Sequence, residues 1–212
     1  MLGSAFCTAV LASCSIDHTP AGAPPEPTTT AKIEVRDLGP TGGQAVTAHP
    51  EHEDPRWRFF TADKARHTSP WFAGRHRVMI GYGCTVAPYY THDDRCPDRQ
   101  GFHHGIDIAM PCGTRLVSDV TGRVVDPRSS GAPGPAYGPD AFRIRSHGLD
   151  FLIGHVRRVY VRPGEAVRRG QLVARANDQG APDGCHLHFE VRRAGGGLTE
   201  TIDPARYLRL SG

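Results

Sequence analysis

The segment Cys185–Val191 reads Cys-His-Leu-His-Phe-Glu-Val, in which apolar and polar side chains alternate as they do in a β-strand. Because successive side chains of a strand point to opposite faces, His186, His188 and Glu190 share one face and the residues between them share the other. Two imidazoles are therefore expected to point into the same space.

Two other motifs carry side chains of the same kind. His103–Asp107 reads His-His-Gly-Ile-Asp, and its first and last residues lie on one face whether the backbone is a strand or a helical turn. Between the two motifs a Gly-His step places His155 at the end of an expected strand. His104 adjoins His103, so spacing alone does not decide which of the two faces the site.

This set of side chains is suited to one catalytic zinc ion. Such an ion typically keeps three nitrogen or oxygen ligands and an open position for water, whereas structural zinc is closed by four ligands that are usually rich in cysteine. The metal activates water near neutral pH and polarises a carbonyl group, and uncoordinated histidines supply proton transfer. An isolated His-x-His is more often two surface histidines, but three such motifs in one chain favour a hydrolytic metal site.

From Val78 to Leu208 the residues resemble the lysostaphin/LytM-type zinc metallo-endopeptidases, which cut peptide cross-links in bacterial peptidoglycan. The first motif of that family reads His-x-Gly-x-Asp and matches His103–Asp107, so the resemblance implies that His104 is not a ligand. Val161–Ala174 is similar to the hairpin that precedes the family's His-x-His strand. The implied fold is mainly β, an antiparallel sheet domain of LytM/lysostaphin type that is related to barrel-sandwich hybrids.

The resemblance also implies a role for each motif residue. His103, Asp107 and His188 are the implied ligands of one Zn²⁺ ion. His155 and His186 are the implied catalytic residues, which stay uncoordinated, activate water and stabilise the oxyanion. The expected activity is hydrolysis of peptide bonds in peptidoglycan stem peptides or cross-bridges by a monomeric enzyme.

Two other functions compete with this interpretation. Some family members have lost a ligand and activate other hydrolases, so a non-catalytic wall-binding or hydrolase-activating module of the same fold is the alternative. This chain keeps all five motif residues, which favours an active enzyme. Pro163–Gln171 also resembles the hairpin of a biotinyl or lipoyl carrier, but the only lysines, Lys32 and Lys64, lie outside the expected β region.

Three more residues are candidates for the site. Glu190 continues the histidine face of its strand, where it either orients a ligand imidazole or is an exposed strand-end charge. The loop from Thr85 to Gln100 is expected to form a groove wall in which Tyr89 or Tyr90 contacts substrate. The acidic residues of this loop do not have the spacing of a calcium-binding loop.

Short strands separated by turn signals are expected throughout the C-terminal part of the chain. They are placed at Val78–Ile80, Gly105–Ala109, Arg115–Ser118, Gly122–Val125, Ala141–Arg145, Phe151–His155, Val159–Val161, Gln171–Ala176 and His186–Val191. Helix is scarce, with one turn expected at Pro204–Leu208. Gly131–Pro139 is expected to be a long loop.

Length and composition indicate one domain with a tail. The chain has 212 residues, 25 Gly and 18 Pro, and its net charge of +3 gives only a weak preference for anionic surfaces such as a cell wall. A Gly-rich phosphate loop is missing, as is the interleaving of aromatic and basic residues that nucleic-acid-binding proteins use. Peptidoglycan rather than nucleic acid is the expected partner.

The N-terminal third is expected to direct and tether the domain. Residues 1–14 are interpreted as a signal or lipoprotein signal segment, because Leu11–Cys14 resembles a lipobox in which Cys14 is lipidated. No Lys or Arg precedes the apolar run, so a simple cleaved signal remains open. Residues 15–66 are expected to be a flexible tether rich in Pro, Thr and Gly, and residues 67–212 the metallopeptidase domain. Export to the cell envelope or beyond follows, and a lipid anchor is the only membrane contact expected.

An exported domain with four remaining cysteines is expected to form two disulfides. Cys185 lies on the strand face opposite the histidines, and Cys112 has the core-side parity of the preceding strand, so these two are expected to pair behind the metal. Cys84 and Cys96 would then close a local loop. The alternative is reduced thiols in a cytosolic protein.

Overall fold

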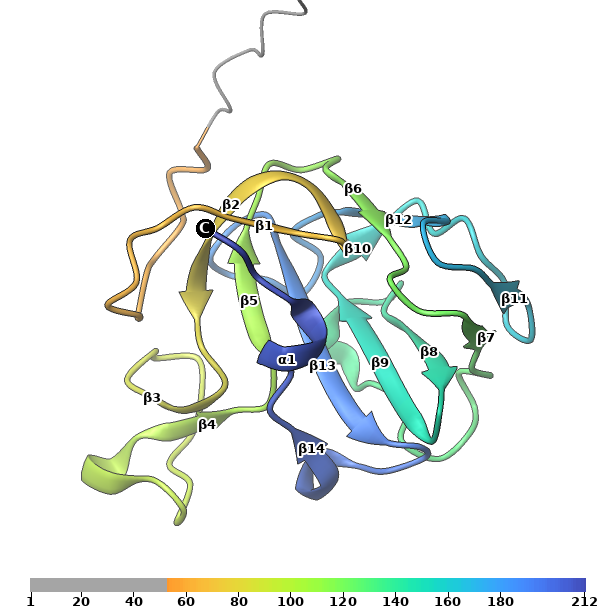
Figure 1. Ribbon diagram of the computed structural model, residues 1–212. Coiled ribbons are helices and arrows are strands. Elements are labelled where there is room, and N and C mark those ends of the chain that lie inside the picture. The colour runs from red at the N-terminus through yellow and green to blue at the C-terminus, as the bar shows by residue number, and fades with distance from the viewer. Residues whose placement is uncertain (1–52) are drawn as a thin grey trace, which may run out of the picture. The chain divides into compact units, whose positions relative to one another are not determined.

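The computed structural model describes residues 53–212, and most of their strands join one antiparallel sheet that curls around its core (Figure 1). The signal segment with Cys14 and the expected tether as far as residue 52 lie outside the described residues. In chain order the strands are β1 (His67–Ser69), β2 (Phe72–Ile80), β3 (Gly83–Thr85), β4 (Gly101–His103), β5 (Ile106–Ala109), β6 (Arg115–Val117), β7 (Gly122–Val124), β8 (Phe142–Ser146), β9 (Leu149–Gly154), β10 (Val156–Arg157), β11 (Ala166–Val167), β12 (Leu172–Ala176), β13 (His186–Arg193) and β14 (Thr201–Ile202).

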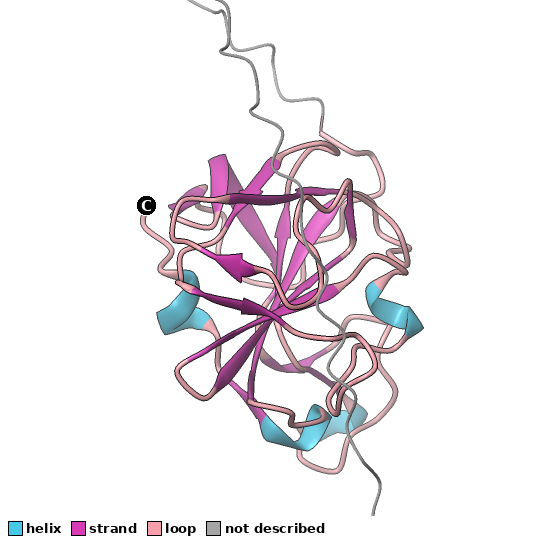
Figure 2. Cartoon of the chain, turned by 90° about the vertical axis from the view of Figure 1, so that its right-hand side faces the viewer, coloured by secondary structure: helices cyan, strands magenta, loops and turns pink. Residues whose placement is uncertain are grey.

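Helical structure within residues 53–212 is short and lies at the margin of the strands, as Figure 2 shows. It consists of α1 (Ala205–Leu208) and three 3-10 turns at Pro97–Arg99, Pro135–Tyr137 and Leu198–Glu200. The expected mainly β, LytM/lysostaphin-like fold is confirmed, as is the single helical turn near the C-terminus. No helix in the described part of the chain is long and apolar enough to cross a membrane.

Strand β13 lies in the middle of the sheet and brings the three histidine motifs together. The sheet order is β10-β12-β6-β2-β5-β13-β9-β8-β7-β11, with β1 beside β2, β14 beside β13, and β3 and β4 in a separate two-stranded sheet. On one side of β13, His188 pairs with Asp107 of β5; on the other side it pairs with Gly154 of β9, the residue before His155. The antiparallel register therefore makes neighbours of motifs that are about 30 to 80 residues apart in the sequence.

The apolar face of β13 supports the core behind the histidines. Phe189 is fully buried and its ring centroid lies 4.7 Å from that of Trp71, which in turn lies 5.6 Å from Phe151. The indole N–H of Trp71 donates to the carbonyl oxygen of Tyr207 at 2.9 Å, so the last helix closes this core. Alternation along one strand thus separates the packing face from the chemical face, as the sequence pattern predicts.

A second apolar cluster forms where the chain enters the domain. Trp57, Phe59 and Phe60 pack against Met79 and Ile80 of β2, together with two buried alanines. The indole N–H of Trp57 donates to the carbonyl oxygen of Cys185 at 2.6 Å, directly before the histidine strand. The sequence Trp57–Phe60 predicts docking on the domain, because exposed aromatic side chains in a linker are costly, and the structure confirms it.

The structure pairs the four cysteines as expected. Cys112 is joined to Cys185 with their Cα atoms 5.2 Å apart, and Cys84 is joined to Cys96 with their Cα atoms 5.4 Å apart. The first disulfide links the segment after β5 to the residue before β13, so it fixes the start of the histidine strand from behind.

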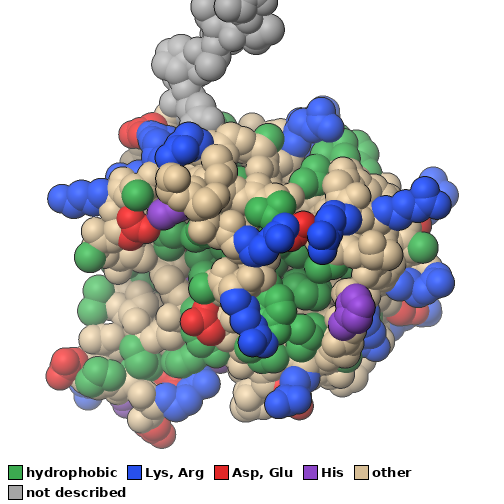
Figure 3. Space-filling view, in the orientation of Figure 1, with side chains coloured by type: hydrophobic (Ala, Val, Ile, Leu, Met, Phe, Trp, Pro, Cys, Tyr) green, Lys and Arg blue, Asp and Glu red, His purple; other side chains and the backbone are tan. Residues whose placement is uncertain are grey.

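One expected strand is wrong and several short ones were not expected. Val159–Val161 is not a strand; the chain instead pairs earlier, at β10, and Tyr160 keeps only a single backbone hydrogen bond to Val173 before the Pro163–Gly164 turn. The strands β1, β3, β4, β11 and β14 have two or three residues each, too few for a periodic pattern to emerge. Figure 3 shows Lys and Arg side chains scattered over the face seen in Figure 1 instead of gathered in one patch.

Candidate metal centre

Three side chains with ligand atoms meet at the end of β4 and on the facing strands β5 and β13. His103, Asp107 and His188 are only 1%, 3% and 5% exposed, respectively. His103 Nε2 lies 3.2 Å from His188 Nδ1 and 3.4 Å from Asp107 Oδ1, and the last two atoms are 2.8 Å apart. Tetrahedral zinc with bonds of about 2.0 Å places its ligand atoms roughly 3.3 Å apart, so this triangle has the dimensions of one face of such a site.

The glycine of the first motif is required by this geometry. A Cβ atom built on Gly105 would lie 2.7 Å from Nε2 of His188 and 2.7 Å from the carbonyl oxygen of Phe189. Real Cβ atoms do not approach other atoms so closely, and the backbone of β13 on the other side cannot yield. Gly105 therefore lets the chain between the two first-motif ligands pass directly over the ring of the third.

Hydrogen bonds behind the triangle fix which nitrogen of each ligand histidine faces it. Nδ1 of His103 donates to the carbonyl oxygen of Gly81 at 2.9 Å, which leaves the lone pair of Nε2 directed at the triangle. Nε2 of His188 donates to Oε2 of Glu190 at 3.2 Å, which leaves the lone pair of its Nδ1 in the same place. Both rings are thus oriented as metal ligands by partners that do not themselves reach the centre.

Electrostatics in the triangle favour a cation. Burial alone would raise the pKa of Asp107, but the charges of His103 and His186 and hydrogen bonds from the ligand histidines hold it well below its usual range. Burial alone would lower the pKa of His188, yet its hydrogen bonds and charge interactions with Asp107 and then Glu190 raise it to about 9. Without metal this centre therefore retains a proton, which a divalent ion would displace on binding.

Glu190 is wholly buried and belongs to a polar network, so the alternative of an exposed strand-end charge is wrong. Its Oε2 accepts a hydrogen bond from the Tyr137 hydroxyl at 2.9 Å, and its Oε1 accepts one from Nε of Arg192. Arg192 also donates to the Tyr137 oxygen at 3.0 Å. Although burial raises the pKa of Glu190, hydrogen bonds and charge interactions with His188 and then Arg192 lower it overall, so the carboxylate stays ionised and orients the His188 ring.

Glu190→Gln tests this orienting role. The amide keeps the shape of the side chain but removes the charge that holds Nε2–H of His188, so zinc affinity is expected to fall by about 10–100-fold. Competition with a coloured zinc chelator measures the affinity, and thermal unfolding checks the fold. Unchanged zinc affinity in a folded Glu190→Gln protein would contradict the assignment.

Two histidines lie beside the triangle without joining it. Nδ1 of His186 donates to the carbonyl oxygen of Gly184 at 2.9 Å, and its Nε2 has no hydrogen-bond partner and lies 3.7 Å from Oδ1 of Asp107. Nδ1 of His155 donates to the carbonyl oxygen of Gln179 at 2.8 Å. The ring centroids of His155 and His186 are 4.4 Å apart. Burial, followed by the charges of His186 and His188, lowers the pKa of His155 to about 3, so this imidazole is neutral.

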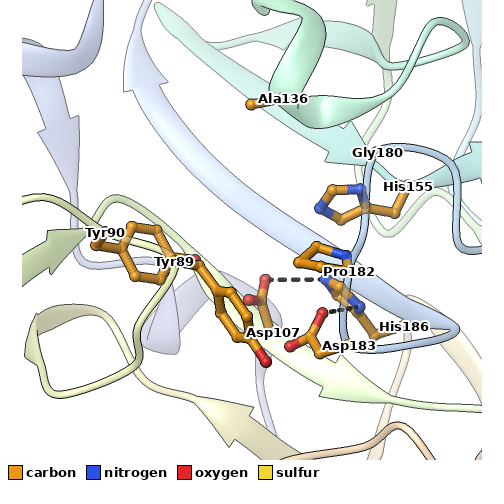
Figure 4. Close-up of a pocket in the computed structure, with 9 residues that line it drawn as sticks. All are labelled: Tyr89, Tyr90, Asp107, Ala136, His155, Gly180, Pro182, Asp183 and His186. Carbon is orange, nitrogen blue, oxygen red and sulfur yellow. Dashed lines mark ion pairs between the residues drawn. The ribbon is translucent and has the colours of Figure 1, made fainter.

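A groove runs past the triangle. One cavity of about 370 Å³ is lined by Asp107, His155, His186 and Asp183, which Figure 4 shows around one space. A second cavity of about 450 Å³ is lined by residues that include His103, His104, Tyr137 and His188. The two cavities share Tyr89, Tyr90, Ala136 and His155, so they adjoin each other, and each is lined in part by residues of the triangle.

The structure places the two expected groove tyrosines in this wall. The ring centroid of Tyr90 lies 5.1 Å from that of His103. Burial raises the pKa of the Tyr90 hydroxyl, and the charge of Asp107 raises this pKa further. Tyr89 is 40% exposed and packs edge-on against Phe60. His104, the ambiguous neighbour, has its Nδ1 3.3 Å from the hydroxyl oxygen of Thr201 and is not part of the triangle.

Two residues of the site were not found by sequence reasoning. Tyr137 comes from the Pro/Gly loop, where no spacing singles it out, yet its ring lies 5.0 Å from that of His188. Asp183 is 3% exposed and one of its oxygens lies 3.6 Å from Nδ1 of His186. Its position three residues before the His-x-His motif was the available signal, but a single acidic residue in a turn is usually solvated.

Fold and centre together define a β-sheet domain in which a His–Asp–His cluster and two free histidines line a groove. Residues 101–204 match the model of Peptidase family M23. The chain therefore carries an M23 peptidase domain, as the resemblance to the lysostaphin-type enzymes predicted.

Relatives and solved structures agree with this assignment. The chain is 36% identical over 104 residues to the lipoprotein NlpD/LppB homolog of Pseudomonas aeruginosa, which is 49% of this chain and 32% of that protein. It is 31% identical over 91 residues to the peptidoglycan DD-endopeptidase ShyA of Vibrio cholerae, which is 42% of this chain and 20% of that protein. The chain thus spans a third or less of the length of these relatives.

The fold is that of lysostaphin. The catalytic domain of this antimicrobial peptidase from Staphylococcus simulans superposes with a TM-score of 0.50 at 20% identity, covering 63% of this chain and 92% of that domain. A longer lysostaphin structure gives a TM-score of 0.51 at 21% identity, covering 70% of this chain and 55% of that one. At such identities the likeness concerns the backbone architecture.

Proposed function

We propose that the protein is a zinc-dependent endopeptidase that hydrolyses peptide bonds in peptidoglycan stem peptides or cross-bridges. The observation that carries the proposal is the buried triangle of His103, Asp107 and His188 with two uncoordinated histidines at its side. A metal-binding module without catalysis needs only the triangle. A hydrolase also needs a group that accepts and returns a proton, and His186 is placed to supply it, with His155 beside it.

His103, Asp107 and His188 would hold the ion, and zinc when bound supplies Lewis acidity and a nucleophilic water near neutral pH. His186 is suited to accept the proton of that water, because its Nε2 is unpartnered and faces the triangle. The same nitrogen then returns the proton to the leaving amine. His155 stays neutral and presents Nε2 as a hydrogen-bond acceptor, since its Nδ1–H is held by Gln179.

The groove and the relatives support peptidoglycan as the substrate. The two adjoining cavities at the centre leave room for a peptide to pass across it, with Tyr89 and Tyr90 as one wall. One relative is named a peptidoglycan DD-endopeptidase, and another is named a lipoprotein. Together with the two disulfides, which are typical of oxidising compartments, these names support export to the cell envelope.

Digestion of purified sacculi tests the proposed function. The protein loaded with one equivalent of zinc is expected to release soluble fragments and free amines, to lose this activity on treatment with a chelator, and to regain it when zinc is restored. Binding to sacculi without release of product by the zinc-loaded protein would instead support a non-catalytic wall-binding or hydrolase-activating module.

A further inference from the structure

Asp183 carries a buried carboxylate for which the catalytic centre has no evident use. It lies in the turn before β13 and lines the 370 Å³ cavity beside His186 (Figure 4). The residue is 3% exposed, and its Oδ2 has no hydrogen-bond partner. Burying an unpaired charge is costly, so an unsatisfied buried carboxylate is a place where a ligand of opposite charge would be stabilised.

The surroundings of Asp183 do not neutralise it. Within residues 53–212 its one ion-pair neighbour is His186, at 3.6 Å from Nδ1, and that nitrogen already donates to the carbonyl oxygen of Gly184. Asp183 is not one of the three residues whose ligand atoms converge on the candidate metal position. Burial raises the pKa of Asp183. The charge of His186 lowers this pKa and the charge of Asp107 raises it, so that the net shift is upward. A cation that enters the cavity from outside would satisfy this carboxylate.

We propose that Asp183 binds an ammonium group of the substrate, so that the enzyme prefers peptides in which a residue beside the scissile bond carries a free amine. This inference rests on the proposed function and adds a substrate class to it. Peptidoglycan stems contain diamino acids, whose free amines are cations of the required kind. A carboxylate and an ammonium ion that meet away from water form a charge-assisted hydrogen bond, which is roughly twice as strong as a neutral one. Asp183 is in this view a specificity determinant that does not take part in bond cleavage.

Three preparations of the same diamino-acid-containing sacculi separate charge from size. The first is untreated, the second has its amines dimethylated reductively, which adds bulk and keeps the charge, and the third has them acetylated, which adds bulk and removes the charge. The zinc-loaded wild-type protein is expected to digest the first two at similar rates and the third about tenfold more slowly, as expected for the loss of one hydrogen bond between charged groups. Release of soluble fragments is measured by chromatography.

Asp183→Asn is expected to digest all three preparations at one similar, reduced rate, because the amide has no charge to match. Asp178→Asn is the control: Asp178 lies in the same turn region, is partly exposed and pairs with Arg56, and its variant should keep the wild-type preference. If Asp183→Asn fails to fold in a thermal unfolding measurement, Asp183→Ser takes its place.

Several results would overturn the proposal. Equal wild-type rates on all three sacculi would do so. A tenfold preference that survives in Asp183→Asn would also overturn it. The variant would then be slower by the same factor on every preparation, which means that Asp183 only positions His186. If the wild-type protein digests none of the three, the proposed function fails. Co-sedimentation with the same sacculi then tests Asp183 alone. The ammonium site is supported if the wild-type protein binds the acetylated preparation more weakly than the other two and Asp183→Asn binds all three equally.

Discussion

His188→Ala is expected to abolish digestion of sacculi and to remove bound zinc. His188 supplies one of three ligand atoms and lies between the other two, at 2.8 Å from Asp107 and 3.2 Å from His103. Loss of a mere outer hydrogen-bond partner typically costs about 10–100-fold in metal affinity, so loss of a ligand should exceed that. Metal analysis after gel filtration and the sacculus assay measure the two effects.

The control for this variant is His147→Asn. His147 is exposed, lies in a turn with φ of 47°, and contacts the hydroxyl of Ser146 far from the triangle in the fold. Asn tolerates that backbone conformation, so both zinc content and activity should stay at the wild-type level. A His188→Ala protein that kept stoichiometric zinc and full activity would refute the ligand assignment.

His186→Ala is expected to separate metal binding from catalysis. The variant should keep its zinc, because His186 lies outside the triangle, and should lose about 10²–10⁴-fold in the rate of hydrolysis, the usual contribution of a positioned general base. His155→Ala should lose less, since its pKa of about 3 makes it a poor proton acceptor near neutral pH. Rates at saturating substrate, compared with zinc content, measure this.

The relative size of the two losses in hydrolysis rate distinguishes the roles of His186 and His155. A larger loss in His155→Ala than in His186→Ala would exchange their roles. Loss of zinc in His186→Ala would instead show that this residue supports the metal, and would contradict its assignment as an uncoordinated catalytic residue.

The sequence predicted the parts of the site that depend on strand geometry. Alternation in His186–Val191 determined which side chains face the groove, and the disulfide between Cys112 and Cys185 followed from the same parity. The choice of His103 over His104 came from family resemblance, because both residues adjoin the motif glycine. The structure settles the placement, because His103 is in the triangle whereas His104 lies against Thr201.

What the sequence could not predict comes from loops. Tyr137 and Asp183 reach the groove from irregular segments whose path is determined by tertiary contacts, and no periodic pattern marks them. The docking of Trp57 was expected, but its hydrogen bond to the carbonyl of Cys185 depends on where the entering chain crosses the sheet. Strands of two or three residues, such as β11 and β14, are likewise products of pairing with a longer neighbour.

The central position of β13 makes the centre sensitive to the alignment of the whole sheet. His188 is opposite Asp107 on one side and Gly154 on the other, and a slip of one residue in either pairing would turn every imidazole of the strand toward the core. Partial alignment yields no partial centre. Binding of a zinc ion during refolding would therefore be an all-or-none signal that three separate segments of the chain have paired in the correct register.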